Sequence, residues 1–197
     1  EIVGCLVGSE MCIRDRYAAK FQKVLAEIED HFSKYRLSDA LMAIYKLVWD
    51  DFCSWFLEMI KPAYAAQIDK KTYKAAVYLL EQNLKVLHPF MPFLTEEIWH
   101  FLDKRNPEES LVISTWPQKI SIDVTLLDDF EFATEVVSGI RNLRKEKQIP
   151  FKTAVEMHII NKELCSQKFD GLISKLGNIS QIKYTEASVD KAFSFRV

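Results

Sequence analysis

The segment IRNLRKEKQIP, residues 140–150, carries the polar side chains with the clearest chemistry in this sequence. Arg141, Arg144 and Lys145 are spaced i, i+3 and i+4, so on a helix they would form one cationic strip. Such a strip suits phosphate groups, because the guanidinium of arginine offers a bidentate fork. The same spacing also suits cations that complement the C-terminal end of a helix dipole. Spacing alone does not decide between these two roles.

A second group of chemically versatile side chains is aromatic and lies on one expected helix: Trp49, Phe52, Trp55 and Phe56. Exposed aromatic rings can stack on unpaired bases, although large aromatic side chains along one helix are more often core residues. Lys46 and Lys61 fall on the polar stripe of the same helix and are ordinary solvated lysines unless a groove lies beside them. We name Trp55 as the stacking candidate.

No catalytic constellation is recognisable, and we expect no catalysis and no metal site within this sequence. It has no glycine-rich phosphate loop, no nucleophile elbow and no H-E-x-x-H zinc motif. Glu96 and Glu97 are adjacent, so on a helix they point about 100° apart, and acidic residues are favoured in a first helical turn. The histidines are scattered and are expected to be surface residues: His31, His88, His100 and His158.

Composition indicates an ordinary globular protein of 197 residues, with 49% hydrophobic residues, 27% charged residues and a net charge of −2. Any binding of nucleic acid must therefore come from a local patch. No apolar run approaches the roughly 20 residues that span a bilayer. The four cysteines show no C-x-x-C spacing, so we expect a soluble protein of the reducing cytoplasm, with Cys53 buried in a helix.

Hydrophobic periodicity predicts five helices, over residues 17–35, 38–61, 72–87, 92–106 and 126–147. Ser38 is the expected N-cap of the second helix. In LHPFMPFLTEEIW, Pro89 should end the third helix and Pro92 can occupy the first turn of the fourth. This break should leave five apolar side chains available to pack: Phe90, Phe93, Leu94, Ile98 and Phe101. After residue 110 a short extended piece is expected.

These elements predict a mainly α protein, a helical bundle over residues 17–150 with a small α+β segment over residues 151–197. In that segment TAVEMHII, ISQIKYTE and AFSFRV have strand patterns, and KELCSQKFDGLISKL is an amphipathic helix. Residues 1–16 show no helical period. We interpret them as a leader outside the fold, either an artefact or disordered.

Three segments together resemble a known family: YRLSDALMAIYKLVWDDFCSWFLEMIKP, LHPFMPFLTEEIW and IRNLRKEKQIP. In this order and spacing they are similar to the C-terminal region of the valyl-tRNA synthetases, which are class I aminoacyl-tRNA synthetases. The similarity covers about residues 17–197. Looser forms of the double-proline segment occur in the leucyl and isoleucyl relatives, whereas the other two segments are closer to the valyl branch.

The resemblance implies an anticodon-binding helical bundle that docks the anticodon stem-loop of valine tRNA for a catalytic domain elsewhere in the enzyme. The full enzyme would use ATP and magnesium and would also edit mischarged threonine, but the nucleotide-binding motifs of class I enzymes are absent from this sequence, and the family's coiled-coil arm would follow residue 197. For RNA contacts we expect Arg141, Arg144 and Lys145, with Lys46, Lys61 and Trp55 as further candidates.

Two alternatives stay open at this point. The chain could be the equivalent domain of an isoleucyl- or leucyl-tRNA synthetase. It could also be a non-catalytic helical scaffold that presents a protein-binding or self-association surface. A convergence of the named cations would favour RNA, and a large exposed apolar patch would favour the scaffold. The oligomeric state is not predicted.

Overall fold

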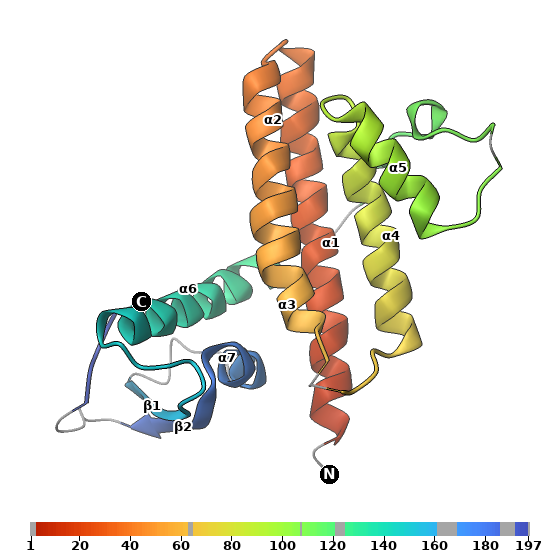
Figure 1. The fold of residues 1–197 in the computed structure, drawn as a ribbon. Helices are drawn as coiled ribbons and strands as arrows, with labels where there is room; N and C mark the ends of the chain where they lie inside the picture. The colour runs from red at the N-terminus through yellow and green to blue at the C-terminus, as the bar shows by residue number, and fades with distance from the viewer. Residues whose placement is uncertain are drawn as a thin grey trace. The chain divides into compact units, whose positions relative to one another are not determined.

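A computed structural model describes residues 3–62, 65–106, 108–120, 125–160, 169–185 and 192–196. The chain forms two compact units, residues 1–123 and residues 124–197. The first is a helical bundle and the second combines one long helix with a small sheet and a short helix (Figure 1). The predicted mainly α class with a small α+β part is confirmed. The division falls near residue 123 instead of after Pro150, so the helix that carries Arg141 belongs to the second unit.

Helix α1 spans Val3–Ser33 and therefore begins well before the expected start at Tyr17. Residues 3–16 are helical, contrary to the expectation that residues 1–16 have no helical period, whereas their interpretation as a leader from outside the family stays a prediction. Ile13, Arg16 and Tyr17 are all buried, which is the i, i+3, i+4 pattern of an inward helix face. The pattern escaped notice because one of its three members is an arginine.

The second helix is continuous but changes its winding along its length. It consists of α2 (Leu37–Tyr45), a π-helical stretch η1 (Lys46–Phe56) and α3 (Leu57–Ile60). The hydroxyl of Ser54 donates to the carbonyl oxygen of Trp49, five residues earlier, at 2.9 Å. The predicted stop before Pro62 is confirmed. The predicted Ser38 cap is wrong, because Arg36 occupies the N-cap position without a side-chain capping bond.

The core of the first unit forms around Tyr17 of α1, which is fully buried against the second helix and α4 (Lys70–Leu87). Its ring centroid lies 5.3 Å from that of Phe52 and 5.0 Å from that of Phe56. Its hydroxyl donates to the side-chain oxygen of Asn83 at 2.8 Å, and the Asn83 amide donates to the Leu79 carbonyl at 2.8 Å. The buried polar pair is thus satisfied inside an aromatic core.

Cys53 lies on the same π-helical stretch and is exposed. The prediction that it is buried is wrong, because Phe52 and Phe56 take the inward positions there. The partial burial that Cys53 does have raises the pKa of its thiol. Cys165 lies outside the described residues.

The double-proline segment redirects the chain as predicted. Helix α4 ends at Leu87, and α5 (Pro92–Leu102) begins with Pro92 in its first turn. Between them, Nδ1 of His88 lies 2.7 Å from the hydroxyl of Thr95. Of the five apolar side chains expected to be available to pack, Phe93, Leu94 and Phe101 are 91%, 50% and 89% exposed.

A second, smaller core joins α4 and α5 to the segment that follows them. It contains Leu84, Trp99 and Leu111, and Leu111 belongs to the 3₁₀ helix η2 (Leu111–Ile113), where an extended piece was expected. The backbone N–H of Leu111 donates to both carboxylate oxygens of Glu96, at 3.0 and 3.1 Å. Desolvation alone would raise the pKa of Glu96, but this bond and one from Ser110 outweigh it and hold the pKa below its usual value.

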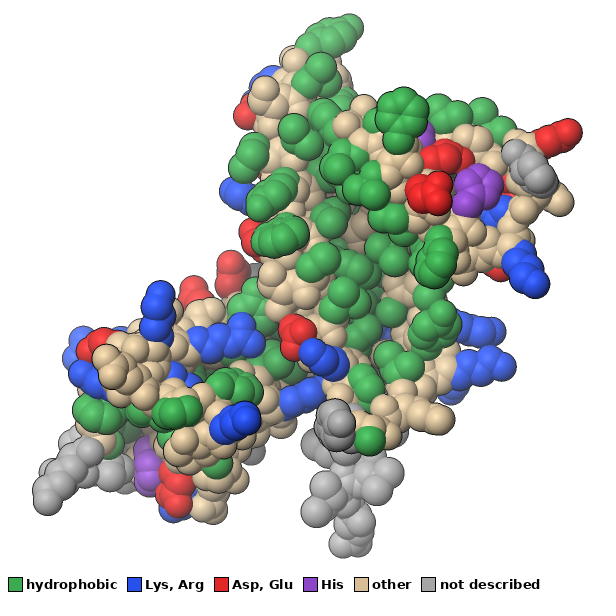
Figure 2. Space-filling model, in the orientation of Figure 1, with side chains coloured by type: hydrophobic (Ala, Val, Ile, Leu, Met, Phe, Trp, Pro, Cys, Tyr) green, Lys and Arg blue, Asp and Glu red, His purple; other side chains and the backbone are tan. Residues whose placement is uncertain are grey.

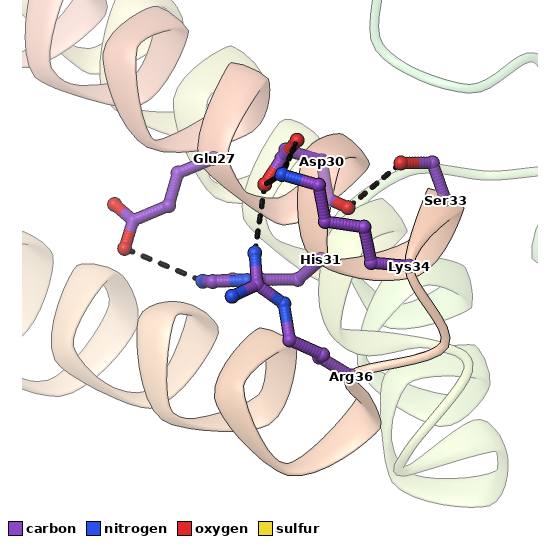
Figure 3. Close-up of polar contacts among 6 residues, drawn as sticks. All are labelled: Glu27, Asp30, His31, Ser33, Lys34 and Arg36. Carbon is purple, nitrogen blue, oxygen red and sulfur yellow. Dashed lines mark hydrogen bonds and ion pairs between the residues drawn. The ribbon is translucent and has the colours of Figure 1, made fainter.

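The turn between α1 and α2 is fixed by a cluster of charged side chains (Figure 3). The carboxylate of Asp30 pairs with Nζ of Lys34 at 2.6 Å and with Nη2 of Arg36 at 2.8 Å. The bond from Lys34 is the main reason that the pKa of Asp30 is lowered. Tyr35, between these cations, adopts a positive φ of 57° and is exposed.

The second unit contains α6 (Thr125–Glu146), β1 (Val155–Ile160), α7 (Asp170–Gly177) and β2 (Ile179–Thr185). The two strands pair in parallel, with α7 leading into β2. The predicted fifth helix and these two strands are confirmed. Residues 192–196 form no strand, contrary to expectation. The first part of the predicted helix, residues 162–168, lies outside the described residues.

Candidate nucleic-acid interface

The three cations predicted to share one strip of α6 separate in the structure. Arg141 and Lys145 are exposed, whereas only 6% of the surface of Arg144 is exposed. The expectation of one continuous cationic strip is therefore wrong at Arg144. Arg141 and Lys145 remain neighbours one turn apart, where Cβ atoms are about 6 Å from each other.

Arg144 is buried because its guanidinium binds three backbone carbonyls of the second unit. Nη1 donates to the carbonyl oxygens of Pro150 at 3.1 Å and Thr153 at 2.9 Å, and Nη2 donates to that of Asn178 at 3.0 Å. Asn178 caps α7 in the left-handed conformation, and its side-chain amide donates to the Phe151 carbonyl at 2.6 Å. Arg144 thus connects the end of α6 to the turn before β1 and to the end of α7. A phosphate could bind this guanidinium only if its hydrogen bonds to these carbonyls were broken.

The exposed cations of α6 lie beside an acid whose charge is already matched. The carboxylate of Glu146 pairs with Nζ of Lys147 at 2.8 Å. Lys147 also lies 5.0 Å over the ring centroid of Phe193. Glu146 therefore does little to neutralise Lys145, and this end of α6 presents net positive charge.

The two lysines named on the second helix have different surroundings. Lys61 forms an exposed ion pair with Glu58 at 3.4 Å. Lys46 lines a groove of about 560 Å³ between α1 and the second helix. The groove's charged lining is mainly acidic: Glu27, Asp39, Asp50 and Asp51, with Lys20 and Lys46. Lys46 and Lys61 also lie 15 residues apart on one helix, which is roughly 20 Å, so these lysines do not converge.

Trp55, the named stacking candidate, is partly buried, and the best exposed aromatic surface of this helix lies elsewhere. Tyr45 and Trp49 are 52% and 59% exposed. Their rings stack with a centroid distance of 6.2 Å and an interplanar angle of 11°. Trp49 was among the aromatic residues noted in the sequence. The pair presents a flat surface to solvent.

A group of cations on α4 was missed by the sequence analysis. Lys70, Lys71 and Lys74 are all exposed at its N-terminal end, next to exposed Tyr73. The available signal was their spacing opposite the buried face that contains Leu79. Lysines at such positions are common on solvated helices, so the pattern alone did not single them out.

Neither a metal site nor a histidine cluster is present among the described residues. No group of three or more His, Cys, Asp or Glu side chains in that part of the chain could hold a metal ion. His31 and His100 each face a carboxylate four residues earlier on their own helix, at 3.5 and 3.2 Å. No described helix is long and apolar enough to cross a membrane.

Comparisons with known proteins give a family match and several similar proteins that agree with one another. The family model for the anticodon-binding domain of tRNA ligases matches residues 16–159. The valine–tRNA ligase of Christiangramia forsetii is 56% identical over 181 residues, which make up 92% of this chain and 21% of that protein. The valine–tRNA ligase of Parabacteroides distasonis is 45% identical over 181 residues, 92% of this chain and 20% of that protein.

A third relative, the valine–tRNA ligase of Bacteroides thetaiotaomicron, is 43% identical over 183 residues, 92% of this chain and 21% of that protein. The chain thus spans about a fifth of the length of the curated relatives that it matches. The family match begins at residue 16, inside α1, and ends inside β1.

Proposed function

We propose that this chain, which belongs to the family of anticodon-binding domains of tRNA ligases, binds the anticodon stem-loop of valine tRNA. The observation that carries the proposal is the family match over residues 16–159 together with 43–56% identity to three valine–tRNA ligases. In the whole protein this binding would position valine tRNA for aminoacylation by a separate catalytic domain. That enzyme would use ATP and magnesium and act in the cytoplasm, and the present chain would supply none of the catalytic groups.

The chemistry of an anticodon loop suits the surfaces that these helices expose. Its bases are unpaired and can stack on aromatic rings, and its phosphates attract exposed cations. Arg141 and Lys145 are the sequence-predicted cations best placed for phosphates, because both are exposed and on one helix face. Tyr45 and Trp49 offer a larger exposed stacking surface than the partly buried Trp55.

Binding of valine tRNA and of an unrelated tRNA across a salt series tests the proposal. We expect tighter binding of valine tRNA and a linear fall of log K with log salt concentration, since a few phosphate contacts release a few counterions. The variant Arg141→Gln, Lys145→Gln should bind both tRNAs more weakly with an unchanged circular dichroism spectrum. Equal binding of the two tRNAs, or no binding at low salt, would contradict the proposal.

The choice of valine over related amino acids rests on the same comparison. Isoleucine and leucine tRNAs are the informative competitors, because the double-proline segment is shared with those synthetases in looser forms. Valine tRNA should compete best with labelled valine tRNA. Better competition by isoleucine or leucine tRNA would assign the domain to that relative instead.

The exposed face of α5 supports a second candidate, a protein-interaction role. Phe93, Leu94 and Phe101 are 91%, 50% and 89% exposed and lie on one side of the helix. Exposed apolar groups of this kind mark interaction surfaces. If the surface drives self-association, sedimentation velocity should show dimers that the Phe93→Ser, Phe101→Ser variant loses. A monomer at all concentrations would refute this candidate.

A further inference from the structure

One face of α4 carries four lysines around a single tyrosine: Lys70, Lys71, Lys74, Tyr78 and Lys85. Lys70, Lys74 and Tyr78 follow one another at intervals of four residues. Lys71 and Lys85 lie seven residues before and seven after Tyr78, which is two helical turns in each direction. The five side chains, called here the α4 cationic face, extend over about 22 Å of helix.

This face lies opposite the buried side of α4, so its side chains reach solvent. The buried positions of the helix are Thr72, Leu79, Asn83, Leu84 and Val86. Lys70, Lys71 and Lys74 are exposed, Lys85 is partly buried, and Tyr78 is 54% exposed. Figure 2 shows Lys and Arg side chains gathered beside the N-terminal end of α4.

The acids nearest in sequence to these lysines are committed to other partners. Glu81 pairs with Arg105, whose guanidinium also lies 3.7 Å over the ring centroid of Trp99. Asp69 caps α4 by accepting hydrogen bonds from the backbone N–H groups of Lys71 at 2.9 Å and Thr72 at 3.0 Å. Within the described part of the chain, none of the four lysines has an ion-pair partner.

Two other exposed lysines of the first unit, Lys34 and Lys119, differ in this respect. Lys34 pairs with Asp30 at 2.6 Å, and Lys119 pairs with Glu29 at 2.5 Å. Their charges are largely matched by neighbours, whereas those of the α4 cationic face are available to an external anion. The two paired lysines therefore provide matched controls for the loss of positive charge.

A convex row of cations with one ring in its middle suits an extended polyanion better than a small anion. A free phosphate would need donors that converge on one point, while this face spreads its donors along about four turns. A backbone of successive phosphates can follow such a row, and an unpaired base can stack on the ring between them. The face carries no large aliphatic side chain that would enter a lipid surface.

We propose that the α4 cationic face contacts the phosphate backbone of bound RNA and that Tyr78 stacks on an unpaired base. This inference rests on the proposed function and names a second contact surface for the same ligand. Lys70 and Lys74 provide the most exposed charges one turn apart, and Lys71 and Lys85 extend the row in both directions. Tyr73, which is 56% exposed, lies beside this row.

The test is binding of the 197-residue chain to a labelled hairpin with the sequence of the valine tRNA anticodon stem-loop, over a salt series. Four variants are compared with the parent chain: Lys70→Ala, Lys74→Ala; Tyr78→Ala; Tyr78→Phe; and the control Lys34→Ala, Lys119→Ala. The first and the control each remove two exposed lysine charges. Circular dichroism melting shows whether each variant keeps its fold.

We expect the Lys70→Ala, Lys74→Ala variant to bind on the order of tenfold more weakly and to lower the salt slope by about 1.5, as two lost phosphate contacts require. Tyr78→Ala should bind the hairpin on the order of tenfold more weakly, because base stacking is lost. Tyr78→Phe keeps the ring and should bind with the affinity of the parent chain. The control should keep both the affinity and the slope of the parent chain.

The outcomes separate this inference from the proposed function. If the parent chain binds the hairpin and the α4 variants bind equally well, the α4 cationic face is not a contact surface, although the proposed function stands. An equal loss in the control would show that only net charge matters, and this would also overturn the inference. If the parent chain binds neither the hairpin nor valine tRNA at low salt, the proposed function itself fails.

Discussion

Replacing Arg144 with alanine should loosen the second unit and leave the first intact. The change removes three hydrogen bonds from a charged donor and leaves the carbonyls of Pro150, Thr153 and Asn178 without that partner. A hydrogen bond to a charged group contributes about 1.5–3 kcal/mol, and three bonds from one side chain do not add independently. We therefore expect a loss of about 3–5 kcal/mol, comparable with the cost of breaking a buried ion pair.

Amide hydrogen exchange is the assay that can locate this loss. All four tryptophans, at positions 49, 55, 99 and 116, lie in the first unit, so their fluorescence reports on that unit. Peptides from β1 and β2 report on the second. Arg144→Ala should accelerate exchange in both strands by on the order of 10²- to 10⁴-fold, given about 1.4 kcal/mol for each factor of ten, while tryptophan fluorescence during urea unfolding stays unchanged.

Arg141 provides the matched control, because it is the same residue type one turn earlier on the same helix and is exposed. Arg141→Ala should change stability by no more than about 0.5 kcal/mol, and it should weaken tRNA binding. The stability of Arg144→Lys should lie between those of the parent chain and Arg144→Ala, because an ammonium group cannot reproduce the planar fork of donors of a guanidinium. If Arg144→Ala left strand protection unchanged and instead abolished RNA binding, the structural role assigned to Arg144 would be refuted.

Three further predictions concern the first unit and its polar contacts. Tyr17→Phe should cost about 1–3 kcal/mol in urea unfolding, because it leaves the buried side-chain oxygen of Asn83 unsatisfied; no loss would mean that water takes the place of the hydroxyl. Because the pKa of Glu96 is lowered in the folded state, its contribution to the free energy of unfolding is complete above the ordinary pKa of 4.5 and is lost as pH falls through the lowered pKa. The melting temperature of the Glu96→Gln variant should therefore depend less on pH below 4.5 than that of the parent chain. Burial lowers the pKa of Arg16 to about 10 although the carboxylate of Asp51 lies 3.4 Å away. Replacing either Arg16 or Asp51 with a nonpolar residue leaves the other charge buried without this partner, so each single variant should lose about 3 kcal/mol in urea unfolding. The variant with both residues replaced should lose much less.

The sequence predicted those parts of the fold that depend on local spacing and on proline. Pro89 and Pro92 set the end of α4 and the start of α5, because the missing N–H and the ring of proline act within one turn. Parts that depend on distant packing were not predicted. The π-helical winding of η1 depends on backbone hydrogen bonds five residues apart, and no propensity rule for single residues anticipates them.

The boundary between the two units, near residue 123, also depends on packing that local sequence patterns do not reveal. The helix that ends near Pro150 has an ordinary amphipathic pattern, and an apolar stripe alone does not tell which partner covers it. Val136 and Ile140 are buried within the second unit, whose α7 supplies Leu172 and Ile173 to its core. A helix is therefore assigned to a unit by its partners, and here these lie C-terminal to it in the sequence.

The cations of α6 and α4 show why candidate contacts cannot be ranked by spacing. An i, i+3, i+4 relation describes positions on one helix, whereas the fate of Arg144 is decided by the Asn178 carbonyl, 34 residues further along the chain. Because both Nη atoms of Arg144 donate to carbonyls, only Arg141 and Lys145 of the predicted strip remain exposed. The lysines of α4 keep their charge available, because the nearby acids Glu81 and Asp69 are bound elsewhere. The availability of a charge to RNA is thus a property of its neighbours, which is why the two surfaces call for different variants and different controls.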